Sequence, residues 1–262
     1  MEKIKVILSY PQVIFREGIH FVLSGEEDFE VAGEAAGNRE AFELIEANPP
    51  DIAILSQNDG KVSGAEMTRR IKRIYPSVGV VLITGLHDSE SVFNSLTSGV
   101  SAHLTPDAGP DRLVAVIRDV AQGRLPAVEE LLTPALAART LADFQDLATL
   151  SERMGITMAQ PSPKEAEILN SIVSGGGIGP VAARLNLAEE IVRNHLRIIL
   201  QKLVANDRVR VLITEVQRSL HSLIPGGLHG GGGPREYLTR AEFIEFKGSL
   251  MVRLKSLVNE NP

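Results

Sequence analysis

The sequence contains no cysteine among its 262 residues. This absence excludes disulfide bonds, thiolate zinc sites and cysteine nucleophiles together. Long hydrophobic runs are also lacking. Runs such as Val78–Ile83 have the length of a β-strand and fall far short of the roughly 20 residues of a membrane-spanning helix. We therefore expect neither a disulfide framework nor a membrane span.

The first residues, Met1 to Lys5, lack the hydrophobic region of a signal peptide and have the pattern of a strand. We expect a soluble, cytoplasmic protein. Hydrophobic residues make up 44% of the chain and charged residues 23%, which supports real hydrophobic cores and excludes wholesale disorder. At roughly 100–200 residues per domain, the length predicts two domains.

The net charge of −6 is distributed unevenly along the chain. Residues 1–160 hold 14 Lys and Arg against 23 Asp and Glu, whereas residues 161–225 hold 8 against 6 and residues 226–262 hold 5 against 4. An acidic front followed by a slightly basic segment suits a regulatory module joined to a nucleic-acid-binding domain, although so small a positive charge decides nothing alone.

Residues 1–123 alternate short apolar runs with segments of helical periodicity. We expect strands at residues 5–9, 29–32, 51–55, 78–84 and 102–105, and helices at residues 13–23, 38–47, 64–74, 89–97 and 110–121. Short strands separated by helices predict βαβ units and a parallel sheet. The predicted fold class is α/β, a doubly wound five-stranded parallel sheet, in which functional residues lie at the carboxyl ends of the strands.

Residues 124–160 are rich in Ala and Leu and predict a helical linker, with a helix from about 135 to 154. The second domain, residues 161–225, is predicted to be all-α. It opens with a helix capped by Ser162 and with Pro163 at its first position. Further helices are expected over 181–185, 189–203 and 208–220, with a tight turn before the longest one. This layout is typical of a helix-turn-helix domain.

A Gly-rich hinge at 226–236 and an amphipathic helix at 237–262 complete the predicted organisation. The apolar stripe of this helix follows spacings of three and four and comprises Phe243, Phe246, Leu250, Leu254 and Leu257. Because such a stripe is unfavourable in water, the helix must dock. We prefer docking within a homodimer to docking on a protein partner. The mixed charges of its polar face argue against membrane binding.

Two sets of residues resemble the response regulators of the NarL/FixJ class, which carry a LuxR-type helix-turn-helix domain. In the front half they are Ile4–Val6, Phe15–Gly18, Val31–Ala36, Pro50-Asp51, Thr84 and Ala121–Gly123. In the back half they are Ser162–Glu165, Glu167–Leu169, Ala182, Arg184-Leu185, Val192–Leu196 and Leu200–Leu203. The resemblance spans residue 3 to about 220. It implies a receiver-like, flavodoxin-like domain followed by a DNA-binding domain.

The sequence departs from this family at the phosphorylation site. Family receivers carry a phosphorylated aspartate after the third strand, where this chain has Ser56. Tyr10 and Pro11 replace the acidic pair that holds magnesium, and Pro106 replaces the lysine that neutralises the phosphoryl oxygens, so that only Thr84 matches. Phosphoryl transfer to a carboxylate needs all of these parts. We therefore expect a degenerate receiver that is not phosphorylated.

The residues left at this edge allow two interpretations. In the first, Ser56 and Tyr10 frame a pocket for a small ligand. In the second, which we prefer, the Tyr10 side chain fills the space that the acidic residues of the family occupy. Thr84 is a residual switch residue or, as we prefer, only hydrogen-bonds its neighbours. Asp59 lies three residues beyond Ser56, in a loop without the partners that phosphoryl transfer requires. The six histidines show no metal-ligand spacing, and no nucleophile, base and orienting group converge, so we expect no metal, no cofactor and no enzymatic activity.

The helix expected over 189–203 is the candidate DNA reader. Arg193 and Arg197 share one helical face, with Asn194 beside them. The resemblance implies base and groove contacts at these three positions and a phosphate contact near Lys202. Arginine can read guanine and asparagine can read adenine. The alternative is an ordinary solvated helix face.

Two features oppose tight DNA binding. Glu190 places a negative charge near the start of the reading helix, close to the phosphates. Gly175–Gly177 and Pro180 loosen the turn before the supporting helix, because glycine is a poor helix former.

The sequence therefore predicts a phosphorylation-independent, DNA-binding transcriptional regulator that forms a homodimer. Its receiver-like domain is expected to serve for dimerisation or partner docking through the helices at 89–97 and 110–121. The alternative is a protein-interaction module whose helix-turn-helix has lost its DNA affinity and whose C-terminal helix binds a partner.

Overall fold

The computed structural model describes residues 3–85 and 89–223. The predicted hinge at 226–236 and the amphipathic helix at 237–262 lie outside these residues. None of the helices in the two described ranges combines the length and apolar character that a membrane span requires.

One parallel sheet organises the N-terminal half. Its strands are β1 (Ile4–Ser9), β2 (Phe29–Ala35), β3 (Ile52–Ser56), β4 (Gly79–Ile83) and β5 (Ala102–Leu104). Their spatial order is β2-β1-β3-β4-β5, and every pairing is parallel. The order reverses direction beside β1, which is the doubly wound arrangement that the sequence predicts.

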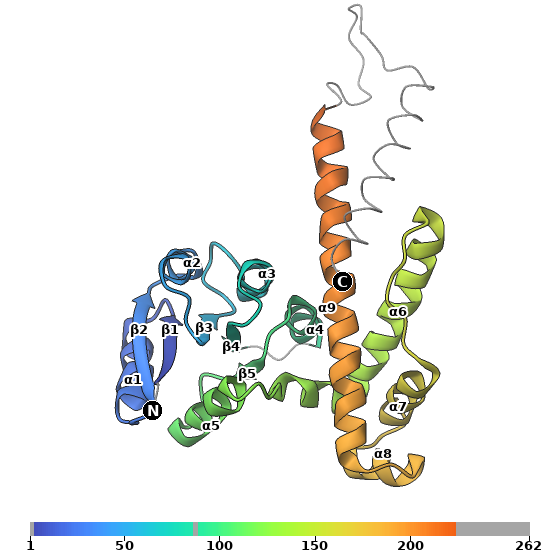
Figure 1. Cartoon of the computed structure of the whole chain (residues 1–262), viewed down its shortest axis with the longest axis horizontal. Coiled ribbons are helices and arrows are strands. Elements are labelled where there is room, and N and C mark those ends of the chain that lie inside the picture. Colours follow the sequence, from blue (N-terminus) through green and yellow to red (C-terminus); the bar gives the residue numbers. More distant parts are fainter. Residues whose placement is uncertain (1–2, 86–88, 224–262) are drawn as a thin grey trace, which may run out of the picture.

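Helices cover both faces of the sheet (Figure 1). They are α1 (Val13–Ser24), α2 (Asn38–Ala47), α3 (Gly64–Ile74), α4 (Ser89–Ser98) and α5 (Pro110–Ala121). Because successive strand residues point to opposite faces, each strand supplies two cores. Leu55 and Leu82 pack in the core of α2, α3 and α4, whereas Ile54 and Val81 pack in the core of α1 and α5.

The linker consists of a short 3₁₀ helix, η1 (Pro126–Leu132), and a long helix, α6 (Pro134–Met154). A proline stands in the first turn of each, where its missing N–H costs no helical hydrogen bond. Helix α6 occupies the range in which the sequence predicts a helix. Its Leu136 and Phe144 belong to the same apolar core as α4, so the linker packs on the receiver-like domain.

The C-terminal domain contains α7 (Pro163–Val173), α8 (Ile178–Leu185) and α9 (Glu189–Leu223). Ser162 and Glu165 form a reciprocal capping box at the start of α7. Asn186 closes α8 in a left-handed conformation, with φ of 51°, and turns the chain into α9. The three helices enclose a core that includes Ile168, Leu169, Val181, Val192, Leu196, Ile199 and Leu203.

Helix α9 is one continuous helix of 35 residues, and the prediction of two helices, over 189–203 and 208–220, is wrong. Asn206 and Asp207 resemble a helix boundary in the sequence, since such residues favour caps and turns. Here tertiary contacts use their side chains instead. The Asn206 amide exchanges two hydrogen bonds with the backbone of Ala159, at 2.8 and 2.9 Å. No glycine or proline occurs between Glu189 and Leu223 to end the helix.

The two halves of the protein touch along α9. Helix α9 lies beside α4 and also contacts η1 and α6 (Figure 1). Helix α4, one of the two helices expected to form a dimer surface, is thus occupied by α6 and α9 within the same chain.

Candidate functional site

The carboxyl edge of the sheet carries a neutral hydrogen-bond network in place of acidic groups. The Ser9 hydroxyl donates to Asn38 Oδ1 at 3.2 Å. The Asn38 amide donates to the carbonyl oxygens of Ser56 and Val62, at 2.9 and 3.0 Å. The Ser56 hydroxyl donates to the carbonyl of Asn58 at 3.2 Å. Ser9, Asn38 and Ser56 are all buried, so this edge is closed by uncharged groups.

Asn38 is a residue of this edge that the sequence analysis does not identify. An asparagine at the start of a helix is typical of an N-cap. In the structure Gly37 is the N-cap of α2 and forms no side-chain cap, while the Asn38 side chain bridges the ends of β1 and β3.

Tyr10 and Thr84 are both buried at this edge. The Tyr10 ring packs against Phe15, with ring centroids 4.4 Å apart, and belongs to the apolar core of α1 and α5. The Thr84 backbone N–H donates to the carbonyl of Leu104 at 2.9 Å. Pro11 and Pro106, in contrast, are exposed. This packing favours the interpretation that Tyr10 fills space rather than frames a ligand pocket.

Asp59 organises the loop that follows β3. Its carboxylate accepts backbone N–H groups from Asn38 at 2.6 Å and from Lys61 and Val62 at 2.9 Å each. Burial disfavours the carboxylate, but these three hydrogen bonds outweigh burial and lower the pKa of Asp59. The Asp59 carboxylate therefore stabilises the backbone of this loop.

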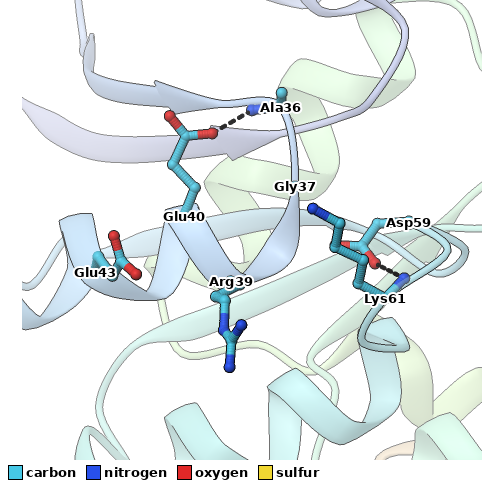
Figure 2. Close-up of a pocket in the computed structure, with 7 residues that line it drawn as sticks. All are labelled: Ala36, Gly37, Arg39, Glu40, Glu43, Asp59 and Lys61. Atoms are coloured by element: carbon cyan, nitrogen blue, oxygen red, sulfur yellow. Dashed lines mark hydrogen bonds between the residues drawn. The ribbon is translucent and has the colours of Figure 1, made fainter.

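Beside Asp59 lies a shallow cavity of about 250 Å³, shown in Figure 2. Charges of both signs surround it, from Arg39, Lys61, Glu40 and Glu43. The Glu40 carboxylate accepts the backbone N–H of Ala36 at 3.0 Å. Across the described ranges, no group of three or more metal-ligating side chains comes together.

The candidate nucleic-acid interface is the first half of α9. The expected face carries Arg193, Arg197 and, beside them, Asn194. Asn194 is exposed, and Arg193 and Arg197 are half-buried. Among the described residues, the Arg197 Nε atom is buried and has no hydrogen-bond partner.

Carboxylates surround Arg193. Glu189 and Glu190 on α9 lie 3.7 and 4.0 Å from its guanidinium, and Glu129 of η1 lies 3.9 Å away. Glu129 belongs to the linker, so one of the acidic groups beside Arg193 comes from outside the helix-turn-helix.

Lys202 is engaged inside its own domain. Its ammonium donates to Glu165 Oε2 at 2.7 Å and to the carbonyl of Gln160 at 3.0 Å. Burial opposes ionisation of Glu165, but the bond from Lys202 and the Ser162 backbone N–H outweigh it and lower the pKa of Glu165. The pair therefore ties α9 to the capping box of α7.

The receiver-like domain covers another part of α9. Arg69 of α3 pairs with the buried Asp207, and Arg208 donates to the carbonyl of Lys72 at 3.3 Å. Burial and the neighbouring Arg208 lower the pKa of Lys72 to about 8. These contacts hold α3 and α4 against the helix that carries the candidate DNA-reading face.

A second set of charges joins α4, α6 and α9. Arg139 of α6 pairs with Glu90 of α4 at 3.1 Å and stacks over the ring of Phe93. Asp143 of α6 is buried and accepts from Arg210 of α9 at 2.8 Å. Helix α9 is thus held by α3 through Asp207 and by α6 through Arg210.

Two protein families match the chain. The family described as "Response regulator receiver domain" matches residues 12–118, and that described as "Bacterial regulatory proteins, luxR family" matches residues 161–214. The transcriptional regulatory protein DegU of Brevibacillus brevis is 30% identical over 227 residues, which cover 82% of this chain and 94% of DegU.

A further relative and a solved receiver domain are also similar to this chain. The probable transcriptional regulatory protein NarL of Mycobacterium tuberculosis (strain ATCC 25618 / H37Rv) is 27% identical over 219 residues, covering 84% of this chain and 96% of the relative. Among solved structures, the receiver domain of NarL from Mycobacterium tuberculosis is 30% identical and covers 47% of this chain and 100% of that domain, with a TM-score of 0.46.

Proposed function

This chain belongs to the response regulators with a LuxR-type DNA-binding domain, and we propose that it regulates transcription by sequence-specific DNA binding without phosphorylation of its receiver domain. The observation that carries the DNA-binding part is the α7–α9 unit, which presents Arg193, Asn194 and Arg197 on the first half of its longest helix within the LuxR-family match.

Independence from phosphorylation rests on the neutral network at the carboxyl edge. A phosphoryl group needs a carboxylate nucleophile, oxygen ligands for a cation and a positive clamp. Ser56 stands at the end of β3 with its hydroxyl bonded to the Asn58 carbonyl. Asp59, the nearest carboxylate in sequence, already accepts three backbone N–H groups. Removing even one preorganised stabilising group typically costs about 10²–10³ in rate.

We propose base or groove contacts for Arg193, Asn194 and Arg197. Lys202, for which the resemblance implies a phosphate contact, donates to Glu165 instead. We propose that Lys202 supports DNA binding by fixing α9 to α7, and that it reaches phosphate only if this bond opens.

DNA binding further requires that Arg193 break its ion pair with Glu129 and contact DNA instead. Both acceptors are anionic and compete for one guanidinium. Movement of η1 away from α9 would remove Glu129, and movement of α3 away from α9 would break the Arg69–Asp207 contact. In this proposal the receiver-like domain and its linker control access to the reading helix through contacts rather than through a phosphoryl group.

A second candidate function is a protein-interaction module that has lost DNA affinity. The three carboxylates around Arg193 favour it, because they neutralise the residue best suited to read a base. In this case the arginine face would have no role in nucleic-acid binding.

Retention of genomic DNA fragments by the full-length protein, measured at several salt concentrations, separates the two functions. Arg193→Ala and Arg197→Ala should each weaken specific binding by about 1–3 kcal/mol. Arg124→Ala is the matched control, because Arg124 is an exposed arginine that follows α5 and pairs with Asp119 of that helix. If neither α9 variant changes retention of any fragment, the interaction module is the better account.

A further inference from the structure

The second half of helix α9 has one apolar side. Its positions follow one another at spacings of three, four, four and three residues, which places them along one line of the helix: Val209, Leu212, Val216, Leu220 and Leu223. The Leu212 side chain is 36% exposed, Val209 is half-buried, and Ala205, one turn earlier, is exposed. An apolar line on an exposed helix face is typical of an interaction surface.

The other sides of this part of α9 already have contacts in the described chain. Asp207 pairs with α3, and Arg210 pairs with α6. Ile213 is buried in a small apolar cluster with residues of α6 and of the loop after it. Leu212 lies about 140° around the helix from Asp207 and about 160° from Arg210, since each residue turns the helix by about 100°. The apolar line is therefore a third side of α9.

The C-terminal segment, residues 237–262, repeats the spacing of this line. Its apolar stripe also follows spacings of three, four, four and three, at Phe243, Phe246, Leu250, Leu254 and Leu257. This order of spacings is the same in both directions. If the segment is helical and runs antiparallel to α9, each apolar position is level with an apolar position: residue 223 with 243, 220 with 246, 216 with 250, 212 with 254 and 209 with 257.

We propose that residues 237–262 dock as a helix, antiparallel, on the apolar side of α9 in the same chain, with Leu250 level with Val216. The two helices then form an αα-hairpin. Contact between the two apolar lines removes both from water, which is the main driving force for such docking.

The stretch between the two helices suits a hairpin. Residues 224–236 contain six glycines and two prolines, and these residues end helices rather than continue them. A Gly-rich stretch of this length has an average end-to-end distance of about 20 Å. Packed helices lie only about 8–10 Å apart. The stretch is therefore long enough to let the segment return along α9.

The same stretch favours docking within one chain over docking on a second copy. A short flexible linker holds the segment near α9 at an effective concentration in roughly the millimolar range, far above that of other molecules in a dilute solution. The sequence alone favours docking within a homodimer. The position of the apolar line, on the helix that directly precedes the linker, favours the same chain instead.

Charges beside the two lines are complementary. In an antiparallel pair, residues on the same flank of the contact face each other. Arg208 and Glu215 lie on one flank of the α9 line, and both are exposed. The proposed alignment places Glu260 beside Arg208 and Arg253 beside Glu215, each within two residues of the level position. Opposite charges thus meet at both places, which favours this alignment.

Docking in this alignment leaves the candidate DNA-reading residues uncovered. The last residue, Pro262, is level with residue 204. Arg193, Asn194 and Arg197 lie about two turns or more closer to the start of α9. The proposed contact is therefore separate from the proposed DNA interface, and its test needs no DNA.

The first experiment uses the lack of cysteine, because two substitutions then introduce a single pair of thiols. Full-length Val216→Cys/Leu250→Cys protein is oxidised at low concentration, and the intramolecular disulfide is measured over time. A disulfide requires Cα atoms about 4.4–6.8 Å apart. The matched control is Val216→Cys/Gly248→Cys, because Gly248 lies on the opposite side of the helical segment after a linker of nearly equal length.

We expect the disulfide to form at least about tenfold faster in Val216→Cys/Leu250→Cys than in the control, because only the first pair faces each other in the hairpin. Equal rates in the two proteins overturn the proposal.

The second experiment measures the rate at which trypsin cleaves the full-length chain after Lys247 and after Arg235. In the wild type, docking should make cleavage after Lys247 the slower of the two. Leu212→Glu should accelerate cleavage after Lys247 by about tenfold or more, because a charge replaces an apolar group at the contact. Ile74→Glu is the control, since Ile74 is a 47% exposed residue of α3. An unchanged rate in Leu212→Glu contradicts the proposal.

Other occupants of this side of α9 give different results. If a second copy covers it, Val216→Cys/Leu250→Cys forms disulfide-linked dimers instead of an intramolecular bond. If an unrelated protein covers it, trypsin cleaves the purified wild type after Lys247 as fast as after Arg235. Each of these results overturns docking within the chain.

Discussion

Arg69 of α3 donates two hydrogen bonds to the Asp207 carboxylate of α9, from Nε to Oδ2 at 2.6 Å and from Nη2 to Oδ1 at 3.2 Å. The residues are 138 positions apart in the chain and belong to different domains. Asp207 is buried, so this two-point contact is sheltered from solvent. It holds the receiver-like domain on the helix that carries the candidate DNA-reading face.

Arg69→Met should increase DNA affinity. The substitution removes both hydrogen bonds between Arg69 and Asp207 and leaves the buried Asp207 carboxylate unpaired. This disfavours the arrangement in which α3 packs on α9, here called the closed arrangement, by about 1.5–3 kcal/mol. If DNA binding requires the closed arrangement to open, a change of about 1.4 kcal/mol in the free energy of opening corresponds to tenfold tighter binding.

Titration of a retained genomic fragment measures this change. Arg73→Met is the matched control, because Arg73 is an exposed arginine on the same helix. An unchanged dissociation constant for Arg69→Met would show that closure of the receiver-like domain does not limit DNA binding.

Lys72 should make the stability of the protein depend on pH in the alkaline range. Burial and the neighbouring Arg208 lower its pKa from 10.5 to about 8 in the folded protein. Between these two values the unfolded chain binds more protons than the folded chain, so the free energy of unfolding contributed by Lys72 rises with pH.

Urea unfolding of the wild type and of Lys72→Met between pH 8 and 10.5 tests this dependence. The wild type should gain stability relative to the variant as pH rises through this range. A constant difference between the two proteins across the range would contradict the lowered pKa.

Glu190→Lys should strengthen DNA binding in general. The change removes one of three carboxylates near Arg193 and adds a positive charge close to the phosphates. One added phosphate contact steepens the plot of log affinity against log salt by up to about one unit. Glu167→Lys, an exposed acid on α7, is the control for a general gain in charge. The same slope in both variants would indicate that position 190 does not face DNA.

Ser56→Asp should not restore phosphorylation. The new carboxylate would stand at the end of β3. However, neither Tyr10 nor Pro11 has a carboxylate to bind magnesium, and Pro106 has no positive charge to stabilise a phosphoryl group. Incubation with acetyl phosphate and magnesium, followed by intact-mass measurement, should find no adduct of about +80 Da, the mass of a phosphoryl group. Labelling of this variant at unit stoichiometry would show that the missing groups are dispensable.

The sequence predicts the sheet and most helices because their apolar patterns repeat every two residues or every three to four. The α2, α3 and α5 bounds match the expected ranges closely. It fails at 204–207, where Asn206 and Asp207 suggest a break. Those side chains bond to Ala159 and Arg69, which are distant in the chain, and no local pattern reveals such contacts.

The candidate site was predictable to a similar extent. The residues at the strand ends, from Tyr10 to Pro106, follow from the positions of the strands. The role of Asn38 does not, because its hydrogen bonds cross from α2 to β1 and β3. The ion pair of Lys202 was not predictable either. Glu165 is 37 residues away in the chain, and only the fold brings its Oε2 atom within 2.7 Å of the Lys202 ammonium.

The central claim is DNA binding that does not depend on receiver phosphorylation. Its most direct test is the dissociation constant of the full-length protein for a retained genomic fragment, measured before and after treatment with acetyl phosphate and magnesium, with intact mass recorded on the same samples. The account predicts specific binding with the same constant in both samples and no adduct. A phosphoryl adduct at unit stoichiometry together with a changed dissociation constant would contradict it.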